Sequence, residues 1–113
     1  MEKIIKFAGP LTKLILDGAK TTTWRTWSAE KLKQSGIAVG EIVSLVYSET
    51  SDEISKAKIT SINETTFGNL SQADKEGHET YSSDEEMYQE YEKFTGKKVT
   101  PETKLFVIKF VLV

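Results

Sequence analysis

The last ten residues of the chain constrain its fold more than any other segment. In Lys104–Val113, apolar side chains occupy both sets of alternating positions, and Lys109 is the single charge that interrupts them. A strand with one wet face alternates apolar and polar residues, so this pattern predicts a central strand that is covered on both faces. The rest of the chain must therefore supply neighbouring strands and a cover for each face.

Four earlier segments have the composition of strands. Residues 42–47 and 54–62 flank the polar residues 48–52 and are predicted to form a hairpin. Residues 20–27 combine threonines with two tryptophans, and residues 3–7, KIIKF, have the composition of a short strand. These segments supply the neighbours that the last strand needs.

Three short helices are predicted in the connections. Each begins at a proline or a serine and ends at a glycine, over residues 10–18, 28–36 and 82–96. Residues 68–83 are polar and lack a period, so we expect a loop with about one helical turn. The third helix carries an apolar stripe made of Met87, Tyr88, Tyr91 and Phe94.

Length and composition fit one ordinary folded domain. The chain has 113 residues, of which 38% are hydrophobic and 28% charged, with only 2 Pro and 7 Gly. A domain of this size can bury a core, and its strands do not alternate with the long helices of a dinucleotide-binding fold. We therefore expect a single α+β domain over residues 1–113, in which about five or six strands curl into a small mixed β-barrel.

The net charge of −2 hides an uneven distribution. Residues 1–40 carry +4 and residues 97–113 carry +3, whereas residues 41–70 carry −3 and residues 71–96 carry −6. If the two basic ends of the chain fold beside each other, the protein presents a positive surface to an anionic partner.

The absence of cysteine, together with a single histidine, His78, excludes several kinds of site. Disulfides, thiolate zinc sites, iron–sulfur clusters and cysteine nucleophiles are ruled out. The acidic residues within 84–92 are predicted to form a solvated helix face, so we expect neither a metal nor a cofactor. The start of the chain has neither a secretory signal nor a membrane span, which favours a cytoplasmic protein; a monomer is preferred.

Residues 20–27 hold the densest group of chemically active side chains. Strand parity places Thr21, Thr23 and Arg25 on one face, where hydroxyls and a guanidinium can hold a phosphate or the edge of a nucleobase. Trp24 lies on the other face and either stacks on a base or, as we favour, belongs to the core. For Arg25, a ligand contact and a structural role are both open.

Two further pairs are candidates for acid–base chemistry. Thr23 is a candidate nucleophile with Lys20 as its base, if burial lowers the pKa of that lysine. The pair requires Lys20 to lie in the turn after Gly18, because residues three apart on a strand face opposite ways. In the irregular stretch before the third helix, His78 and Glu79 are candidate acid–base groups, and a surface loop without function is the alternative.

These residues resemble the ASCH domain family. The resemblance covers nearly the whole chain and implies a PUA-like β-barrel with a cleft beside residues 18–25. For the broad family it implies binding of RNA, a nucleotide or a nucleoside, and we expect Thr21, Trp24, Arg25 and His78 to contact this ligand. The landmarks, in order, are LILDGAKTTTWR (residues 14–25), GE (40–41), AKI (57–59), FGNL (67–70) and VIKF (107–110).

One branch of the family is similar to this chain and consists of N4-acetylcytidine amidohydrolases. Its lysine and the threonine three residues later fall on Lys20 and Thr23, and its glutamate falls on Glu79, with Glu76 as a competitor. The resemblance implies that Thr23 attacks the acetyl carbonyl, Lys20 removes its proton, and Glu79 transfers a proton or holds the lysine. Another branch cuts RNA, so a ribonuclease is a third alternative.

Overall fold

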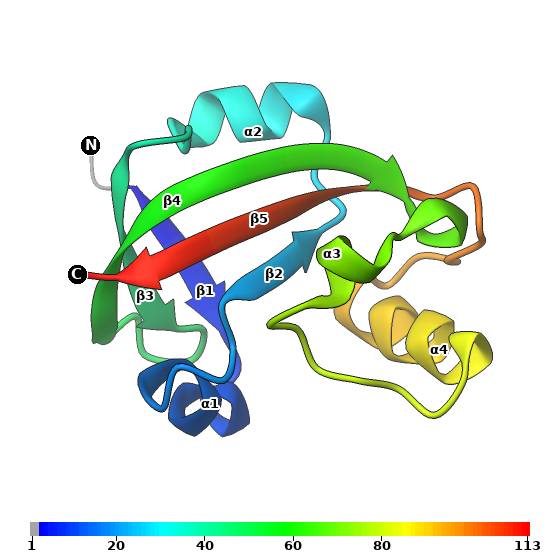
Figure 1. Cartoon of the computed structure of the whole chain (residues 1–113), viewed down its shortest axis with the longest axis horizontal. Coiled ribbons are helices and arrows are strands. Elements are labelled where there is room, and N and C mark those ends of the chain that lie inside the picture. Colours follow the sequence, from blue (N-terminus) through cyan, green and yellow to red (C-terminus); the bar gives the residue numbers. More distant parts are fainter. Residues whose placement is uncertain (1–2) are drawn as a thin grey trace.

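The computed structural model describes residues 3–113 as a curled five-stranded sheet with helices in its connections (Figure 1). The strand order β1-β3-β4-β5-β2 places β5 between β4 and β2, so the predicted central position of the last strand is confirmed. β1 pairs with β3 in parallel, and the other pairs are antiparallel. In chain order the elements are β1 (Ile4–Phe7), η1 (Gly9–Leu11), α1 (Thr12–Leu16), β2 (Thr22–Arg25), α2 (Ala29–Ser35), β3 (Ile42–Tyr47), β4 (Glu53–Thr66), η2 (Phe67–Asn69), α3 (Gln72–Lys75), α4 (Asp84–Thr95) and β5 (Lys104–Leu112).

The sheet is open, which corrects the expected barrel. β1 and β2 form its two edges, each is only four residues long, and no ladder joins them within residues 3–113. A side chain bridges the edges instead: Nη2 of Arg25 on β2 donates a hydrogen bond to the backbone oxygen of Lys6 on β1 at 2.7 Å. Register shifts at Leu45/Val46 and Ile59/Ser61 mark irregularities in two ladders, and such irregularities bend and twist a strand locally.

β3 and β4 form the predicted hairpin. The amide of Tyr47 donates to the carbonyl of Asp52 at 2.9 Å and closes the turn. β4 is longer than predicted because its first part pairs with β3, whereas its pairing with β5 runs on to Thr66 opposite Lys104. In Figure 1 it arches over the molecule beside β5.

β5 separates two hydrophobic clusters, as expected of a strand that is covered on both faces. Phe106, Ile108 and Phe110 belong to the cluster that contains β1, β3 and α1 side chains. Leu105 and Val107 belong to the other cluster, on the side of α4. The α4-side cluster consists of Trp24, Phe67, Met87, Tyr91, Val99, Leu105 and Val107.

α4 begins and ends where the sequence predicts. Ser83 Oγ accepts a hydrogen bond from the amide of Glu86, and Gly96 ends the helix at a φ of +69°. Met87 and Tyr91 are buried, but Phe94, which the periodicity assigns to the same stripe, is 65% exposed. It lies in the last turn of α4 and is not part of the α4-side cluster.

The remaining connections are short. The predicted first helix is a 3-10 turn followed by α1, and the predicted helical turn in residues 68–83 is α3, which begins at a capping box of Ser71 and Asp74. Within residues 3–113, none of the helices has the length and apolar character that crossing a bilayer requires.

Candidate functional site

Backbone contacts hold the loop after α3 against the start of β2. The amides of Thr21 and Thr22 donate to the carbonyl of Gly77 at 2.9 and 3.1 Å, and Thr22 Oγ1 donates to the carbonyl of Glu76 at 2.6 Å. Nζ of Lys109 on β5 donates to Thr22 Oγ1 at 3.1 Å and to the carbonyl of Glu76 at 3.2 Å. The lysine that interrupts the last strand therefore helps to anchor this loop.

Gly77 is the point of closest approach in this contact. Its φ is +76°, a conformation that side chains other than glycine rarely adopt. A Cβ atom at this position would overlap Thr21 Oγ1 and would lie 3.2 Å from Thr22 Oγ1. The fit places the next two residues, His78 and Glu79, beside the end of the turn that precedes β2.

Lys20 lies in that turn and is only 3% exposed. Its Nζ donates hydrogen bonds to Glu79 Oε2 at 2.6 Å and to the carbonyl of Thr22 at 2.9 Å. Burial lowers the pKa of Lys20, and the attraction of the Glu79 carboxylate offsets only part of this effect. Burial alone would raise the pKa of Glu79, but Lys20 and then His78 pull it below its usual value.

His78 lies against the core rather than in solvent. Its ring stacks on Trp24, with centroids 3.7 Å apart and planes 9° apart. Nδ1 lies 3.0 Å from the backbone oxygen of Glu79 and 3.1 Å from its Oε2, and Nε2 lies 3.1 Å from the hydroxyl of Tyr91. Burial, and then the nearby Lys20 ammonium, lower the pKa of His78 to about 4, so the ring is neutral at pH 7.

The partners of the neutral ring decide where its proton lies. Both oxygens of Glu79 near Nδ1 can only accept, so Nδ1 carries the hydrogen and Nε2 accepts from the Tyr91 hydroxyl. Burial raises the pKa of Tyr81 to about 12 and that of Tyr91 well above its usual value, so both hydroxyls keep their protons at neutral pH. A continuous chain of polar contacts thus runs from the Tyr91 hydroxyl through His78 and Glu79 to the ammonium of Lys20.

Thr23 and Arg25 lie on one face of β2, as the strand parity predicts. Nε of Arg25 donates to Thr23 Oγ1 at 3.0 Å, and the guanidinium packs over Phe7 and Trp27 at 4.9 and 5.8 Å from the ring centroids. Burial lowers the pKa of Arg25 to about 10, which leaves it charged at neutral pH. Thr23 is 4% exposed and makes no hydrogen bond to Lys20 within residues 3–113.

A cleft of about 1430 Å³ contains most of these groups. Lys20, Thr23, Arg25, His78 and Glu79 line its inner end, and the last turn of α4 forms part of its rim. A smaller pocket of about 400 Å³ meets the cleft at Lys20 and Glu79. Within residues 3–113, no three His, Asp or Glu side chains are grouped closely enough to hold a metal ion.

The charge of the cleft differs in sign from that of the chain. Seven basic and four acidic side chains line it, a net charge of +3 against −2 for the whole sequence. All seven basic residues come from the two basic ends of the chain, which the pairing of β2 with β5 brings side by side. They are Lys6, Lys20, Arg25, Lys31, Lys97, Lys98 and Lys104.

Comparison with known proteins identifies the family. A family model described as the ASCH domain matches residues 3–113, nearly the entire chain. The chain belongs to the ASCH domain family. No functionally curated protein matches it.

Solved structures support the fold of this ASCH domain. An ASCH domain from Lactobacillus crispatus is 17% identical with a TM-score of 0.68, covering 96% of this chain and 77% of that one. A protein from Enterococcus faecalis is 16% identical with a TM-score of 0.73, covering 100% and 77%. A protein from Pyrococcus furiosus is 20% identical with a TM-score of 0.64, covering 100% and 98%. At these identities the likeness concerns the fold alone.

The structure brings together most of the residues that the sequence singled out in this ASCH domain. Lys20 and Glu79 are in contact, and the competitor Glu76 supplies only its backbone carbonyl to the contacts described above. Trp24 lies in the core, and its Nε1 donates to the carbonyl of Asp74 at 3.0 Å. Thr21 does not line the cleft, because it lies against Gly77.

Sequence reasoning did not assign three residues to the site: Gly77, Tyr91 and Lys109. The only signal for Lys109 is its charge within an apolar strand, and the signal for Gly77 is its place beside the single histidine. Tyr91 fits the apolar stripe of α4, so nothing in the periodicity distinguishes its role toward His78 from ordinary core packing.

Proposed function

We propose that this ASCH domain binds RNA in its cleft, with one nucleotide seated at the inner end. The observation that carries the proposal is the charge of the cleft, which is +3 in a chain with a net charge of −2. Lysine and arginine side chains that neutralise phosphates supply most of the affinity of proteins for nucleic acids. A volume of about 1430 Å³ exceeds the ~300 to 1000 Å³ typical of small-molecule sites and leaves room for more than one nucleotide.

The inner end offers groups that suit a base or a ribose rather than a phosphate alone. Thr23 supplies a hydroxyl, Glu79 a carboxylate that accepts hydrogen bonds, and Thr80 a further hydroxyl, and all three line the cleft. Arg25 is held in place by Thr23, the carbonyl of Lys6 and two aromatic rings, so its guanidinium is oriented before a ligand arrives.

The test measures binding of a fluorescent single-stranded RNA by anisotropy over a series of KCl concentrations. We expect affinity to fall steeply with salt, and Lys104→Ala and Lys31→Ala each to reduce the slope of log K against log[KCl] by roughly 0.7 for every lost phosphate contact. Lys33→Ala is the matched control, because Lys33 is an exposed lysine of α2 outside the cleft. Equal effects of all three substitutions, or binding insensitive to salt, would place the RNA elsewhere.

The buried pair of Lys20 and Glu79 favours a second candidate, hydrolysis of an amide such as the acetyl group of N4-acetylcytidine. Transfer of a proton from the Lys20 ammonium to the Glu79 carboxylate, across 2.6 Å, leaves a neutral amine that can take the proton of Thr23. The Thr23 oxygen then bonds to the acyl carbon, the carbon–nitrogen bond breaks, and Lys20 returns the proton to the departing amine. Water hydrolyses the resulting ester and restores Thr23.

An assay for cytidine released from N4-acetylcytidine tests this candidate. Turnover should be abolished by Lys20→Ala and by Thr23→Ala, and Thr60→Ala, an exposed threonine of β4 outside the cleft, should leave it unchanged. Turnover that survives both active-site substitutions, or no turnover by the unaltered protein, rejects the amidohydrolase. Denaturing gels of the RNA from the binding reactions report cleavage, which is the ribonuclease alternative.

A further inference from the structure

The rim of the cleft carries an exposed aromatic ring that the core does not use. Phe94 is 65% exposed and lines the cleft, and its one aromatic contact within residues 3–113 is with Tyr91, edge to face at 5.8 Å and 84°. This contact leaves most of the Phe94 ring in solvent. A large apolar ring at the edge of a charged cleft is a ready stacking surface for a base.

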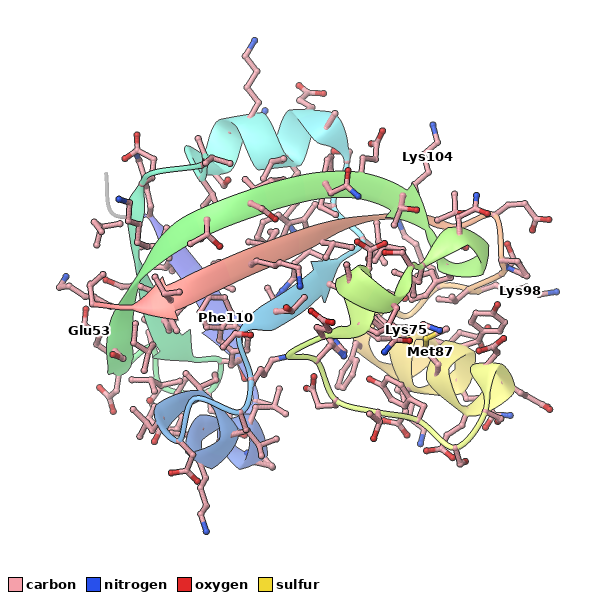
Figure 2. The ribbon with its side chains drawn as sticks, in the orientation of Figure 1. Glu53, Lys75, Met87, Lys98, Lys104 and Phe110 are labelled. Carbon is pink, nitrogen blue, oxygen red and sulfur yellow. The ribbon has the colours of Figure 1, made fainter. Side chains whose placement is uncertain are left out.

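Three lysines that form no ion pair within residues 3–113 line the cleft together with this ring. Lys97 and Lys98 follow α4 directly, line the same cleft and are exposed, and neither ammonium forms an ion pair within residues 3–113. Lys104, at the start of β5, has the same properties, and Figure 2 shows it at the same end of the molecule as Lys98. By contrast, Lys93 of α4 is paired with Glu90.

Contacts connect the ring to the inner end of the cleft. Phe94 packs on Tyr91, the Tyr91 hydroxyl contacts His78, and His78 contacts Glu79, which binds Lys20. The rim ring is therefore one helical turn away from a residue that belongs to the inner end. Glu86 and Glu90 lie nearer the start of α4 and also line the cleft, so phosphates are disfavoured on that side and favoured toward Lys97 and Lys98.

We propose that Phe94, Lys97 and Lys98 form a second nucleotide subsite, in which a base next to the seated nucleotide stacks on Phe94 while the lysines hold its phosphate. This inference rests on the proposed function and makes the ligand a single-stranded segment of RNA rather than a free nucleoside. A duplex would not serve, because its bases are already stacked on one another and are not free to lie on a side chain.

The test compares a mononucleotide with a short single-stranded oligonucleotide, each titrated against the unaltered protein and against Phe94→Ala. Phe94→Ala should weaken oligonucleotide binding by roughly fivefold to a hundredfold, the range expected for one lost base–aromatic stack, and should leave mononucleotide binding within about twofold. Phe94→Trp should restore the oligonucleotide affinity. Leu16→Ala is the control, because Leu16 is 53% exposed and lies outside the cleft.

The outcomes separate this inference from the proposed function. The subsite is overturned if the oligonucleotide binds no more tightly than the mononucleotide, or if Phe94→Ala binds both ligands as tightly as the unaltered protein does. Either result leaves the proposed site at the inner end of the cleft unaffected. If the unaltered protein binds neither the mononucleotide nor the oligonucleotide, both the subsite and the proposed function are overturned. A DNA oligonucleotide of the same sequence that binds as well as the RNA rejects the assignment to RNA. Sedimentation in which Phe94→Ala dissociates a dimer would instead assign the ring to self-association.

Discussion

The inner end and the rim of the cleft are built in opposite ways. At the inner end, Lys20, His78 and Glu79 are largely buried, and each contacts the next, so the loss of one group leaves another without its partner. At the rim, Phe94 and Lys97 are exposed, and no ion pair fixes that lysine within residues 3–113. The difference teaches that, under the proposed function, inner residues serve both stability and the ligand, whereas rim residues serve the ligand alone.

The strongest test of this contrast is Gly77→Ala. Alanine is strained at a φ of +76°, and its Cβ overlaps Thr21 Oγ1, so the loop is pushed away from β2 and the contact of Glu79 with Lys20 is weakened. We expect the free energy of unfolding to fall by about 3 kcal/mol or more, read from urea denaturation followed by tryptophan fluorescence.

Gly18→Ala is the matched control for this prediction. Gly18 has nearly the same φ, +79°, but a Cβ there meets nothing within 4 Å, so the loss should be only about 1 kcal/mol. Adding Thr21→Ala to Gly77→Ala removes the overlapping hydroxyl and should recover part of the stability. Equal losses at the two glycines would show that the close packing of the loop contributes nothing.

The second prediction concerns pH. The unfolded chain binds a proton at His78 below its usual pKa of 6.5, whereas the folded chain binds it only near pH 4. Stability therefore falls as the pH drops through this window, by up to about 1.4 kcal/mol per pH unit and about 3 kcal/mol in all. Urea denaturation at a series of pH values measures the slope.

His78→Gln provides the comparison, because His78 is the single histidine of the chain. Between pH 5 and 6.5 the carboxylates contribute little, since the lowered pKa of Glu79 shifts its effect below its usual value of 4.5. The slope in that range should disappear in the variant. A slope that persists in the variant would show that groups other than His78 cause it, and no slope in the unaltered protein would show that the ring is already charged when folded.

The third prediction separates the pair itself from its surroundings. Lys20→Met leaves the Glu79 carboxylate, whose side chain is 24% exposed, without its ammonium partner, and should cost about 2 kcal/mol of unfolding free energy. The double variant Lys20→Met/Glu79→Gln removes both charges and should be more stable than the single one. Glu79→Gln alone completes the cycle, and if the losses of the two single variants add up to that of the double variant in urea denaturation, the two groups do not interact.

Residues near in sequence were the ones that could be predicted. The caps of α4 at Ser83 and Gly96, and the hairpin turn at residues 48–52, depend on neighbouring residues, and the structure confirms them. Which of Glu76 and Glu79 contacts Lys20 was not predictable from the sequence. It depends on hydrogen bonds between two segments more than 50 residues apart in the chain. The open sheet and the exposure of Phe94 likewise depend on how far each strand or helix is packed against its neighbours. A periodic pattern shows which residues share a face but not where the packing of that face stops.

The fourth prediction concerns Arg25, which lines the inner end of the cleft and bridges the two edges of the sheet. Arg25→Lys keeps the charge but cannot donate at once to Thr23 Oγ1 and to the carbonyl of Lys6. We expect a loss of about 1 kcal/mol in thermal or urea unfolding. Lys31→Ala, which removes another cation from the Trp27 ring at an exposed position, should stay within about 0.5 kcal/mol. If Arg25→Lys were as stable as the unaltered protein, the hydrogen bonds of Arg25 would not hold the two edges of the sheet together.

The smallest expected effect on stability is at the rim. Phe94→Ala removes one edge-to-face contact with Tyr91 and a ring that is 65% exposed, and alanine favours the helix, so unfolding should change by less than about 0.5 kcal/mol. Met87→Ala on the same helix is the buried counterpart and should cost about 3 kcal/mol because it opens a cavity in the α4-side cluster. If Phe94→Ala were as destabilising as Met87→Ala, the ring would be a structural residue, and its exposure at the cleft would no longer argue for a ligand.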